Sequence, residues 1–106
     1  MKILPEPVVF DWDKGNINKN FEKHEVSDKE AEEAFENSDL YIFEDKQHSQ
    51  VEKRYGVFGI TDKRRLLSVA FTLRKDKVRI ITARDMSRRE RRAYEKIKKN
   101  QADSKI

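Results

Sequence analysis

The residues best suited to chemistry in this chain are arginines concentrated toward its end. Residues 79–92 read RIITARDMSRRERR, so a β-branched stretch leads through a short bend into a segment rich in guanidinium groups. A guanidinium group is always charged and presents a planar fork of donors that matches phosphate oxygens. A strand that brings several arginines together therefore predicts a phosphate-binding surface. Such a surface indicates a protein that acts on RNA rather than a metabolic enzyme.

The strand that carries these arginines is predicted to pair with the strand before it. Residues 66–74 and 78–84 alternate with a period of two around a tight turn, which sets Phe71 opposite Ile80. One face then buries Leu67, Val69, Phe71, Leu73, Val78 and Ile80. The other face carries Ser68, Ala70, Thr72 and Arg74 opposite Ala83, Ile81, Arg79 and Lys77. A shift by one residue would bury Arg79, so we expect Arg74 and Arg79 outside the core with Thr72 beside them.

The elements that precede these strands are predicted from caps and periodicity. Residues 8–12 read as a short strand. Asp13 then reads as the N-cap of a helix that ends near His24, with Ile17 and Phe21 on its buried face. Residues 27–30 form a capping box that begins a second helix, in which Val26 and Ala31 make a hydrophobic staple. The buried stripe of that helix is Ala31, Ala34 and Phe35.

The rest of the chain completes a mixed fold. Residues 40–43 and 54–60 read as two further strands, and residues 87–90 form a second capping box that begins the last helix. Ala93, Tyr94 and Ile97 form a narrow apolar stripe on that helix. The order of elements predicts an α+β fold, an antiparallel sheet with two N-terminal helices on one face and a C-terminal basic helix.

Composition and charge limit the class of protein. The 106 residues fit a single domain with a core over about 8–99, a flexible arm at 1–7 and a flexible tail at 101–106. The absence of cysteine excludes disulfides and thiolate metal sites, and no membrane-spanning or leader segment is predicted, so we expect a cytoplasmic protein. Residues 1–60 carry 8 Lys/Arg against 14 Asp/Glu, whereas residues 61–106 carry 16 against 6. The second half can therefore attract a polyanion, although two charged faces can also serve solubility alone.

Three groups of residues, taken in order, resemble the BrnT-type toxin family. The first group is Phe10-Asp11-Trp12-Asp13, Asn20-Phe21-Glu22-Lys23-His24, Glu30-Ala31 and Phe35. The second group is Glu52-Lys53-Arg54-Tyr55, Gly59, Leu66-Leu67, Arg74 and Arg79-Ile80-Ile81-Thr82-Ala83-Arg84. The third group is Ser87-Arg88-Arg89-Glu90-Arg91 and Tyr94. The chain departs from the family pattern at Glu25, at Asp28 and in the extra residues 1–7, and the first two departures concern the turn between the first two helices.

The resemblance implies a fold, an activity and partners. Members of this family resemble RelE-type ribonucleases in fold and act as the toxin of a toxin–antitoxin pair. The resemblance implies RNA cleavage that slows translation, and we predict no cofactor. It also implies neutralisation by a BrnA-type antitoxin of the ribbon-helix-helix class, in a hetero-oligomer that binds operator DNA through the antitoxin.

A ribonuclease that uses no metal needs three kinds of groups. It needs a base for the 2′-hydroxyl, cations for the crowded phosphate and an acid for the leaving 5′-oxygen. Arg74, Arg79 and Arg84 are the predicted cations. Arg54 is a fourth, although the facing of its strand is ambiguous. The alternative is a solvated sheet face whose charges prevent edge-to-edge aggregation.

The proton-transfer groups are less clearly marked than the cations. His24 is the preferred group because imidazole, with a reference pKa of ~6.5, exchanges protons near neutrality. At a helix C-terminus it can equally serve as a structural cap. Lys23 is a candidate phosphate contact. Glu52 can act as a base or orient Arg54, although a plain salt bridge is the commoner outcome.

Two further features leave alternatives open. Asp45 and His48 have a metal-like spacing, but two ligands in a polar loop without cysteine or a third histidine are a weak signal, so we interpret His48 as a loop residue and predict no metal site. On the last helix, Arg88, Arg91 and Arg92 can track an RNA backbone, receive acidic groups of an antitoxin or simply be solvated. The whole pattern also fits a non-catalytic module that binds nucleic acid or a protein through a basic sheet face.

Overall fold

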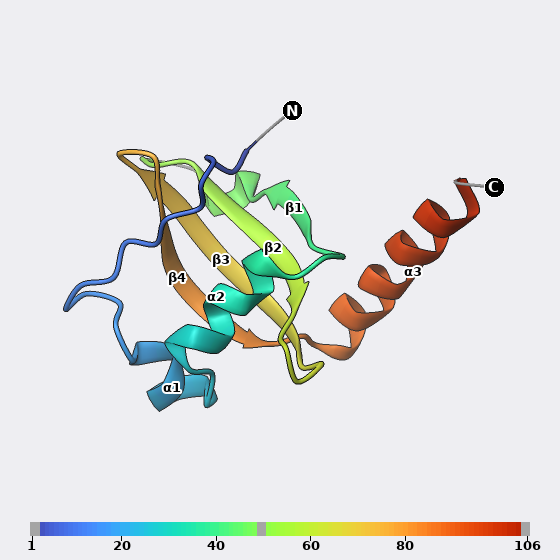
Figure 1. The fold of residues 1–106 in the computed structure, drawn as a ribbon, viewed down its shortest axis with the longest axis horizontal. Helices are drawn as coiled ribbons and strands as arrows, with labels where there is room; N and C mark the ends of the chain where they lie inside the picture. The colour runs from blue at the N-terminus through green and yellow to red at the C-terminus, as the bar shows by residue number, and fades with distance from the viewer. Residues whose placement is uncertain (1–2, 49–50, 105–106) are drawn as a thin grey trace.

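The computed structural model describes residues 3–48 and 51–104, which form one antiparallel sheet and three α-helices. The helices are α1 (Lys19–His24), α2 (Asp28–Glu36) and α3 (Arg88–Ser104), and a short 3-10 turn, η1, spans Lys46–His48. The strands are β1 (Tyr41–Glu44), β2 (Arg54–Ile60), β3 (Leu66–Arg74) and β4 (Lys77–Asp85). They lie in the order β1-β2-β3-β4, with α2 across one face (Figure 1). The predicted α+β fold is confirmed, and no helix among the described residues is both long and apolar enough to cross a membrane.

The covered face of the sheet is held by α2, whose capping box is confirmed. The Ser27 hydroxyl accepts from the Glu30 main-chain N–H at 3.1 Å, and the Glu30 carboxylate accepts from the Ser27 N–H at 3.1 Å. The predicted stripe of Ala31, Ala34 and Phe35 is buried against β2 and β3. Helix α2 approaches so closely that a Cβ at Gly59 would overlap the Ala34 carbonyl oxygen. Only glycine at position 59 lets the helix rest on the sheet at this distance.

The pairing of β3 with β4 follows the predicted register over only part of its length. Phe71 lies opposite Ile80 and Thr72 opposite Arg79, as expected, but the register then shifts at a bulge between Ala70 and Phe71. Ala70 faces Thr82 and Val69 faces Ala83, so Ile81 is the extra residue of β4. The predicted pairs of Ala70 with Ile81 and Ser68 with Ala83 are therefore wrong. The bulge buries Ala83 completely and sets Arg84 opposite Ser68.

The segment before α1 differs from its prediction. Residues 8–12 form no strand of their own, because only Phe10 makes a bridge, parallel to Val78. The Val78 N–H donates to the Val9 carbonyl at 2.8 Å, and the Asp11 N–H donates to the Val78 carbonyl at 2.8 Å. This segment thus shields the outer edge of β4 over a single residue pair rather than extending the sheet.

The first helix is also shorter than predicted. It begins at Lys19 rather than after Asp13, and Ile17 and Phe21 are 48% and 57% exposed instead of buried. The buried residues here are Asn16 and Asn20. The Asn20 side-chain oxygen accepts from the Ala83 N–H at 2.9 Å, and the Asn16 amide donates to the Ile80 carbonyl at 3.2 Å. Because β4 has no strand on its outer side, these amides satisfy its main chain, and polar residues are buried where apolar ones were expected.

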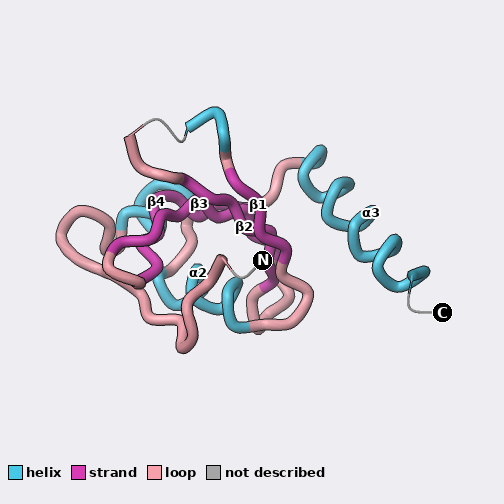
Figure 2. The backbone as a smooth tube through the Cα atoms, turned by 90° about the horizontal axis from the view of Figure 1, so that it is seen from above, coloured by secondary structure: helices cyan, strands magenta, loops and turns pink. Residues whose placement is uncertain are grey.

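Helix α3 is attached at its beginning and then leaves the body. Its predicted capping box is confirmed, since the Ser87 hydroxyl accepts from the Glu90 N–H at 3.1 Å. Tyr94 is buried against Tyr41 in a small cluster that also holds Phe58, Met86 and Leu66. Ala93 is exposed and Ile97 half-buried, so the predicted stripe covers the core only through Tyr94. The reason is visible in Figures 1 and 2, where the helix extends past the sheet.

Parts of the arm and tail predicted to be flexible lie within the described residues. Ile3 and Leu4 of the predicted arm pack against the main core. Helix α3 continues to Ser104, through part of the predicted tail. The remaining residues of both segments, 1–2 and 105–106, lie outside the described part of the chain.

Candidate active site

The face of the sheet opposite α2, here called the open face, gathers most of the predicted cations. Arg54, Thr72 and Arg79 lie side by side on β2, β3 and β4, because Thr72 pairs with both arginines across neighbouring strands. The ambiguous facing of Arg54 is thereby resolved. Arg74, two residues beyond Thr72, adds a fourth polar group at the same end of the sheet.

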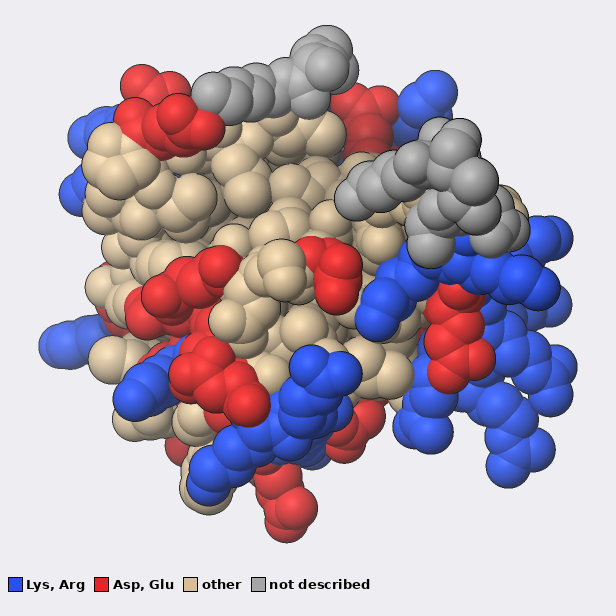
Figure 3. All heavy atoms as spheres, turned by 45° about the vertical axis from the view of Figure 1, so that its right-hand side comes forward, with Lys and Arg blue, Asp and Glu red and all other residues tan. Residues whose placement is uncertain are grey.

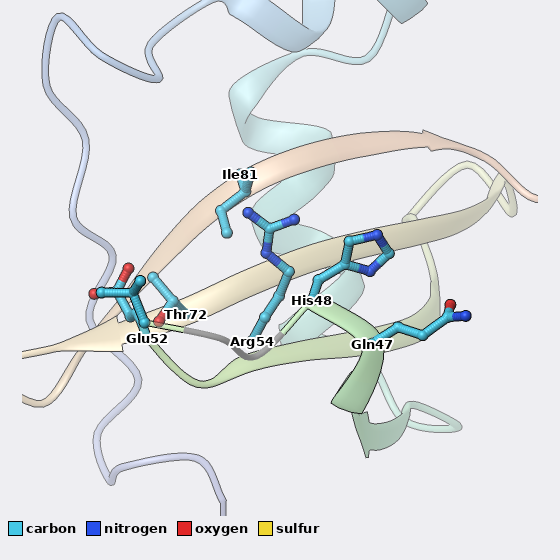
Figure 4. Close-up of a pocket in the computed structure, with 7 residues that line it drawn as sticks. Gln47, His48, Glu52, Arg54, Thr72 and Ile81 are labelled. Carbon is cyan, nitrogen blue, oxygen red and sulfur yellow. The ribbon is translucent and has the colours of Figure 1, made fainter.

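These side chains surround two adjoining hollows. One, of about 250 Å³, is lined by Gly15, Asn16, Glu52, Arg54, Thr72, Arg74, Arg79, Ile80 and Ile81. The other, of about 430 Å³, is lined by Gln47, His48, Val51, Glu52, Arg54, Thr72 and Ile81 (Figure 4). Glu52, Arg54, Thr72 and Ile81 belong to both. We call the two hollows together the arginine cavity.

Carboxylates hold two of these arginines in place. The Arg79 guanidinium donates twice to Asp13, at 2.9 and 3.0 Å, and lies 3.6 Å from Asp11. The Arg74 guanidinium donates twice to Glu52, at 3.0 and 3.2 Å. These hydrogen bonds lower the pKa of Asp13 and of Glu52, so both carboxylates are ionised near neutrality. Glu52 is thus committed to Arg74, not Arg54, and its lowered pKa makes it a weak proton acceptor.

The Arg79 guanidinium also lies close to the main chain of the N-terminal loop. A Cβ at Gly15 would come within 2.7 Å of one of its nitrogens, so the loop passes the guanidinium without a side chain between them. Arg79 is only 13% exposed as a result, whereas its partner Asp13 is 57% exposed. The loop therefore holds Arg79 in position while leaving the carboxylate in solvent.

Thr72 supports the floor of the cavity. Its side chain is 2% exposed, and its hydroxyl donates to the Lys53 carbonyl at 2.7 Å. This bond fixes the residue before Arg54 against β3. Thr72 therefore has a structural role in addition to its place in the cavity lining.

Arg84 lies on the open face but farther along it. Its guanidinium donates to both carboxylate oxygens of Glu90, at 2.6 and 3.0 Å, and the Ser68 hydroxyl donates to the same carboxylate at 3.1 Å. The hydrogen bonds from Arg84, with one from the Ser87 main chain, lower the pKa of Glu90 to about 2 despite partial burial. Arg84 thus joins β4 to the first turn of α3.

The structure does not bring His24 and Lys23 to the arginine cavity. Both lie in the last turn of α1, where the carbonyl of His24 accepts from the Arg65 guanidinium at 3.3 Å. Arg65 also donates to Asp85 at 2.6 and 3.0 Å. Asp85 is six residues from Arg79 along β4, or about 20 Å. The imidazole predicted for proton transfer is therefore at the opposite end of this strand from Arg79 and Arg74, at the end that carries Arg84.

The remaining predicted contacts, Arg88, Arg91 and Arg92, are exposed on α3. Figure 3 shows Lys and Arg side chains massed on the right of the molecule, over this helix. They form a basic surface separate from the arginine cavity.

His48, interpreted from the sequence as a loop residue, ends the short turn η1 beside the arginine cavity. Its imidazole lines the arginine cavity, and its Nδ1 lies 2.8 Å from the Asp45 carboxylate. In Figure 4 the imidazole and the Arg54 guanidinium rise from the same side of the strands. The signal for this pair in the sequence is the Asp-x-x-His spacing, which we interpret there only as two possible metal ligands. In the described part of the chain, no group of three or more His, Asp or Glu residues is arranged to hold a metal.

The comparisons with known proteins give a family for the chain. The family model described as the ribonuclease toxin BrnT of a type II toxin–antitoxin system matches residues 12–90, which include all strands and the cavity-lining residues. The comparison with curated proteins found no match. The predicted resemblance is confirmed, and the chain belongs to the BrnT family of ribonuclease toxins of type II toxin–antitoxin systems.

Proposed function

We propose that this toxin is an endoribonuclease that cuts RNA at the arginine cavity without a metal ion. The observation that carries the proposal is the convergence of Arg54, Arg74 and Arg79 on one hollow of the open face. The phosphate of a reacting RNA gains charge in the transition state, and fixed guanidinium groups stabilise that charge. Their forked donors suit the non-bridging oxygens of the phosphate.

The reaction that fits this set of groups is internal transesterification. The 2′-oxygen attacks the adjacent phosphorus as its proton is removed, and the bond from phosphorus to the 5′-oxygen breaks. The products are a 2′,3′-cyclic phosphate and a 5′-hydroxyl. DNA lacks the attacking hydroxyl and is not cut.

The carboxylates of the cavity give it a resting state. Asp13 and Glu52 occupy the donors of Arg79 and Arg74 in the free protein. Both are exposed, at 57% and 42%, so an RNA phosphate can take their place at little cost in desolvation. The cations are therefore positioned before the substrate arrives.

The proposed cellular role is inhibition of translation through RNA cleavage in the cytoplasm. The proposed partner is a BrnA-type antitoxin of the ribbon-helix-helix class, and the pair binds operator DNA through that antitoxin. The surface we propose for docking combines the exposed Arg88, Arg91 and Arg92 of α3 with Arg74 or Arg79 at the far end of the open face. Acidic groups of the partner would neutralise both.

Incubation of the purified full-length protein with labelled single-stranded RNA tests the activity. We expect cleavage in EDTA and a 2′,3′-cyclic phosphate on the upstream product. Placing one 2′-deoxynucleotide at the cut site should stop cleavage there. Cleavage that is lost in EDTA and restored by magnesium contradicts the metal-independent mechanism. RNA binding with no cleavage supports the non-catalytic alternative instead.

A further inference from the structure

We infer that His48, held by Asp45, is the general base that accepts the proton of the attacking 2′-hydroxyl. This inference rests on the proposed ribonuclease function and assigns its proton acceptor. The other titratable side chains near the cations fit less well. Glu52 is hydrogen-bonded twice to Arg74, and His24 belongs to the other end of the sheet.

The turn that carries His48 is fixed to the sheet. The Asp45 main-chain N–H donates to the Arg54 carbonyl at 2.8 Å, which joins the start of the turn to β2. The His48 N–H donates back to the Asp45 carbonyl at 3.3 Å. The imidazole and carboxylate, three residues apart, then meet at 2.8 Å between Nδ1 and Oδ2. The turn and this hydrogen bond together set the imidazole beside the cavity.

The hydrogen bond to Asp45 selects the chemistry of the ring. A carboxylate accepts, so Nδ1 carries a hydrogen and Nε2 keeps its lone pair in the neutral imidazole. That lone pair can take the proton of a hydroxyl group. The carboxylate then stabilises the imidazolium that forms, which is the role of the acidic residue in a serine hydrolase triad.

The position of His48 suits a hydroxyl next to a bound phosphate. His48 and Arg54 line the same hollow, which continues through Glu52 and Thr72 to Arg74 and Arg79. A phosphate held by the arginines would place its 2′-oxygen neighbour within the same cavity. Asp45 on the same turn contacts the imidazole, and the other charged groups that line this hollow are Arg54 on β2 and Glu52 just before β2.

The proposed step balances without a co-reactant other than water. Nε2 of His48 accepts the 2′-hydroxyl proton as the 2′-oxygen forms its bond to phosphorus. The phosphorus–5′-oxygen bond breaks, and the departing oxygen takes a proton from solvent water. The imidazolium then returns its proton to the solvent, so the RNA alone is changed.

The test compares variants of the full-length protein with a labelled RNA. We expect His48→Gln to lower the cleavage rate by about 10²–10⁴-fold, the usual contribution of a general base. Its affinity for a 2′-O-methyl RNA, which cannot react, should stay near that of the wild type. Lys46→Gln, a change at an exposed neighbour on η1, is the matched control and should alter the rate by no more than about twofold. Thermal unfolding of each variant checks that the protein is folded.

The partner of the imidazole and an NMR signal separate a base from a residue that only shapes the cavity. Asp45→Asn removes the carboxylate that accepts from Nδ1, so the cleavage rate should fall while the affinity for the 2′-O-methyl RNA stays near that of the wild type. The chain has two histidines, and His24→Gln therefore assigns their imidazole NMR signals without ambiguity. The 2′-O-methyl RNA should shift the His48 signal more than the His24 signal.

The outcomes distinguish this inference from the function on which it rests. If the wild type cuts RNA and His48→Gln cuts it equally well, the inference is wrong and the ribonuclease function stands. If His24→Gln suffers the large loss instead, the base is His24 and the inference is overturned. If the folded wild type cuts no RNA, the proposed function fails and the inference fails with it.

Discussion

Arginines at opposite ends of β4 bind their partners in different ways. Arg65 lies at the Asp85 end, and Arg74 and Arg79 lie at the other end. Arg65 donates to the carboxylates of Asp85 and Glu30 and also to the main-chain carbonyls of His24 and Glu25, at 3.3 and 2.8 Å. At the other end, Arg79 and Arg74 donate to the exposed carboxylates of Asp13 and Glu52. A substrate phosphate can replace a carboxylate, but it cannot replace the end of a helix. The comparison thus separates an arginine that builds the fold from arginines that can bind a ligand.

The arginines also differ in how fully their guanidinium nitrogens are used as hydrogen-bond donors within the protein. All three nitrogens of the Arg65 guanidinium donate within the protein, and they join α1, α2 and β4. The hydrogen bonds that Arg65 donates to Asp85 and Glu30 raise the pKa of Arg65 well above its usual range, against the effect of burial. Arg65 also donates to the last carbonyls of α1, which a helix of six residues would otherwise leave to solvent. Its removal should therefore affect folding, and removal of Arg79 should affect cleavage.

The largest expected effect is on cleavage by Arg79→Ala. The variant loses a guanidinium at the reacting phosphate, so the cleavage rate should fall by about 10²–10³-fold. Arg79→Lys keeps the charge but loses the forked donors of the guanidinium. Its cleavage rate should lie between the rates of the wild type and Arg79→Ala. Initial rates with labelled RNA measure the effect. Equal rates for Arg79→Ala and the wild type would show that this end of the sheet is not the site.

The next effect is on stability in Arg65→Ala. In this variant, two carboxylates and two main-chain carbonyls lose the hydrogen bonds that Arg65 donates. The free energy of unfolding should therefore fall by about 2–3 kcal/mol. Urea unfolding measures it, with Arg64→Ala as the matched control because Arg64 is an exposed neighbour. The cleavage rate per folded molecule should change little. A large loss of cleavage with unchanged stability would reverse the assignment of the two groups.

The pair of Arg84 and Glu90 tests a case between these two groups. Arg84 lies on the open face, yet its partner is fixed by Ser68 and by the capping box at Ser87. The pKa of Glu90 is lowered from its ordinary 4.5 to about 2, so its stabilising effect is complete above 4.5 and is lost as the pH falls toward 2. We expect about 1–2 kcal/mol from this carboxylate, a figure that allows for partial exposure.

Unfolding measured at two pH values checks this expectation. At pH near 6, Glu90→Gln should be less stable than the wild type by that amount. Near pH 3, the gap should narrow, because Glu90 then binds a proton in the unfolded chain, where its pKa is the ordinary 4.5, while it stays largely ionised in the folded wild type. A gap that stays constant with pH would mean that Arg84 does not stabilise the charged form of Glu90. Arg84 would then belong with the open-face arginines.

The sequence predicted well those features that depend on local pattern. Both capping boxes and the α+β order follow from short spacings that the structure confirms. The row of Thr72 and Arg79 follows from the alternation of β3 and β4 near their turn. Alternation failed at Ile81 because one extra residue in a strand changes the facing of everything after it.

The features that the sequence did not predict depend on contacts between distant segments. Asn16 and Asn20 are buried because the outer edge of β4 needs partners, and nothing near either asparagine in the sequence indicates that edge. Phe21 is exposed for the same reason, since the polar face of α1 is turned to β4. His48 reaches the cavity only because η1 is joined to β2 beside Arg54. Arg65 looked like any loop arginine, since its partners are 20 to 41 residues away.

The smallest expected effect concerns arginines that belong to neither group. Arg88 and Arg92 are exposed on α3, where the helix extends away from the sheet (Figure 2). Charges in this setting attract an acidic partner over a distance but contribute little once they are screened. We expect Arg88→Glu with Arg92→Glu to slow association with the antitoxin several-fold at low salt and to change dissociation less, as is usual for rim charges. Arg64→Ala, which removes an exposed charge from the body of the protein, is the comparison.

Surface plasmon resonance at two salt concentrations separates the two rates. The difference between variant and wild type should shrink at high salt, since the Debye length falls from about 10 Å at 0.1 M to about 3 Å at 1 M. If the doubly reversed variant associates normally at low salt, α3 is not the docking surface. The antitoxin would then have to neutralise the toxin at the arginine cavity itself, where Arg79→Ala would weaken the complex as well as the cleavage. That result would place the partner and the substrate on the same guanidinium groups and leave the projecting helix without a role in docking.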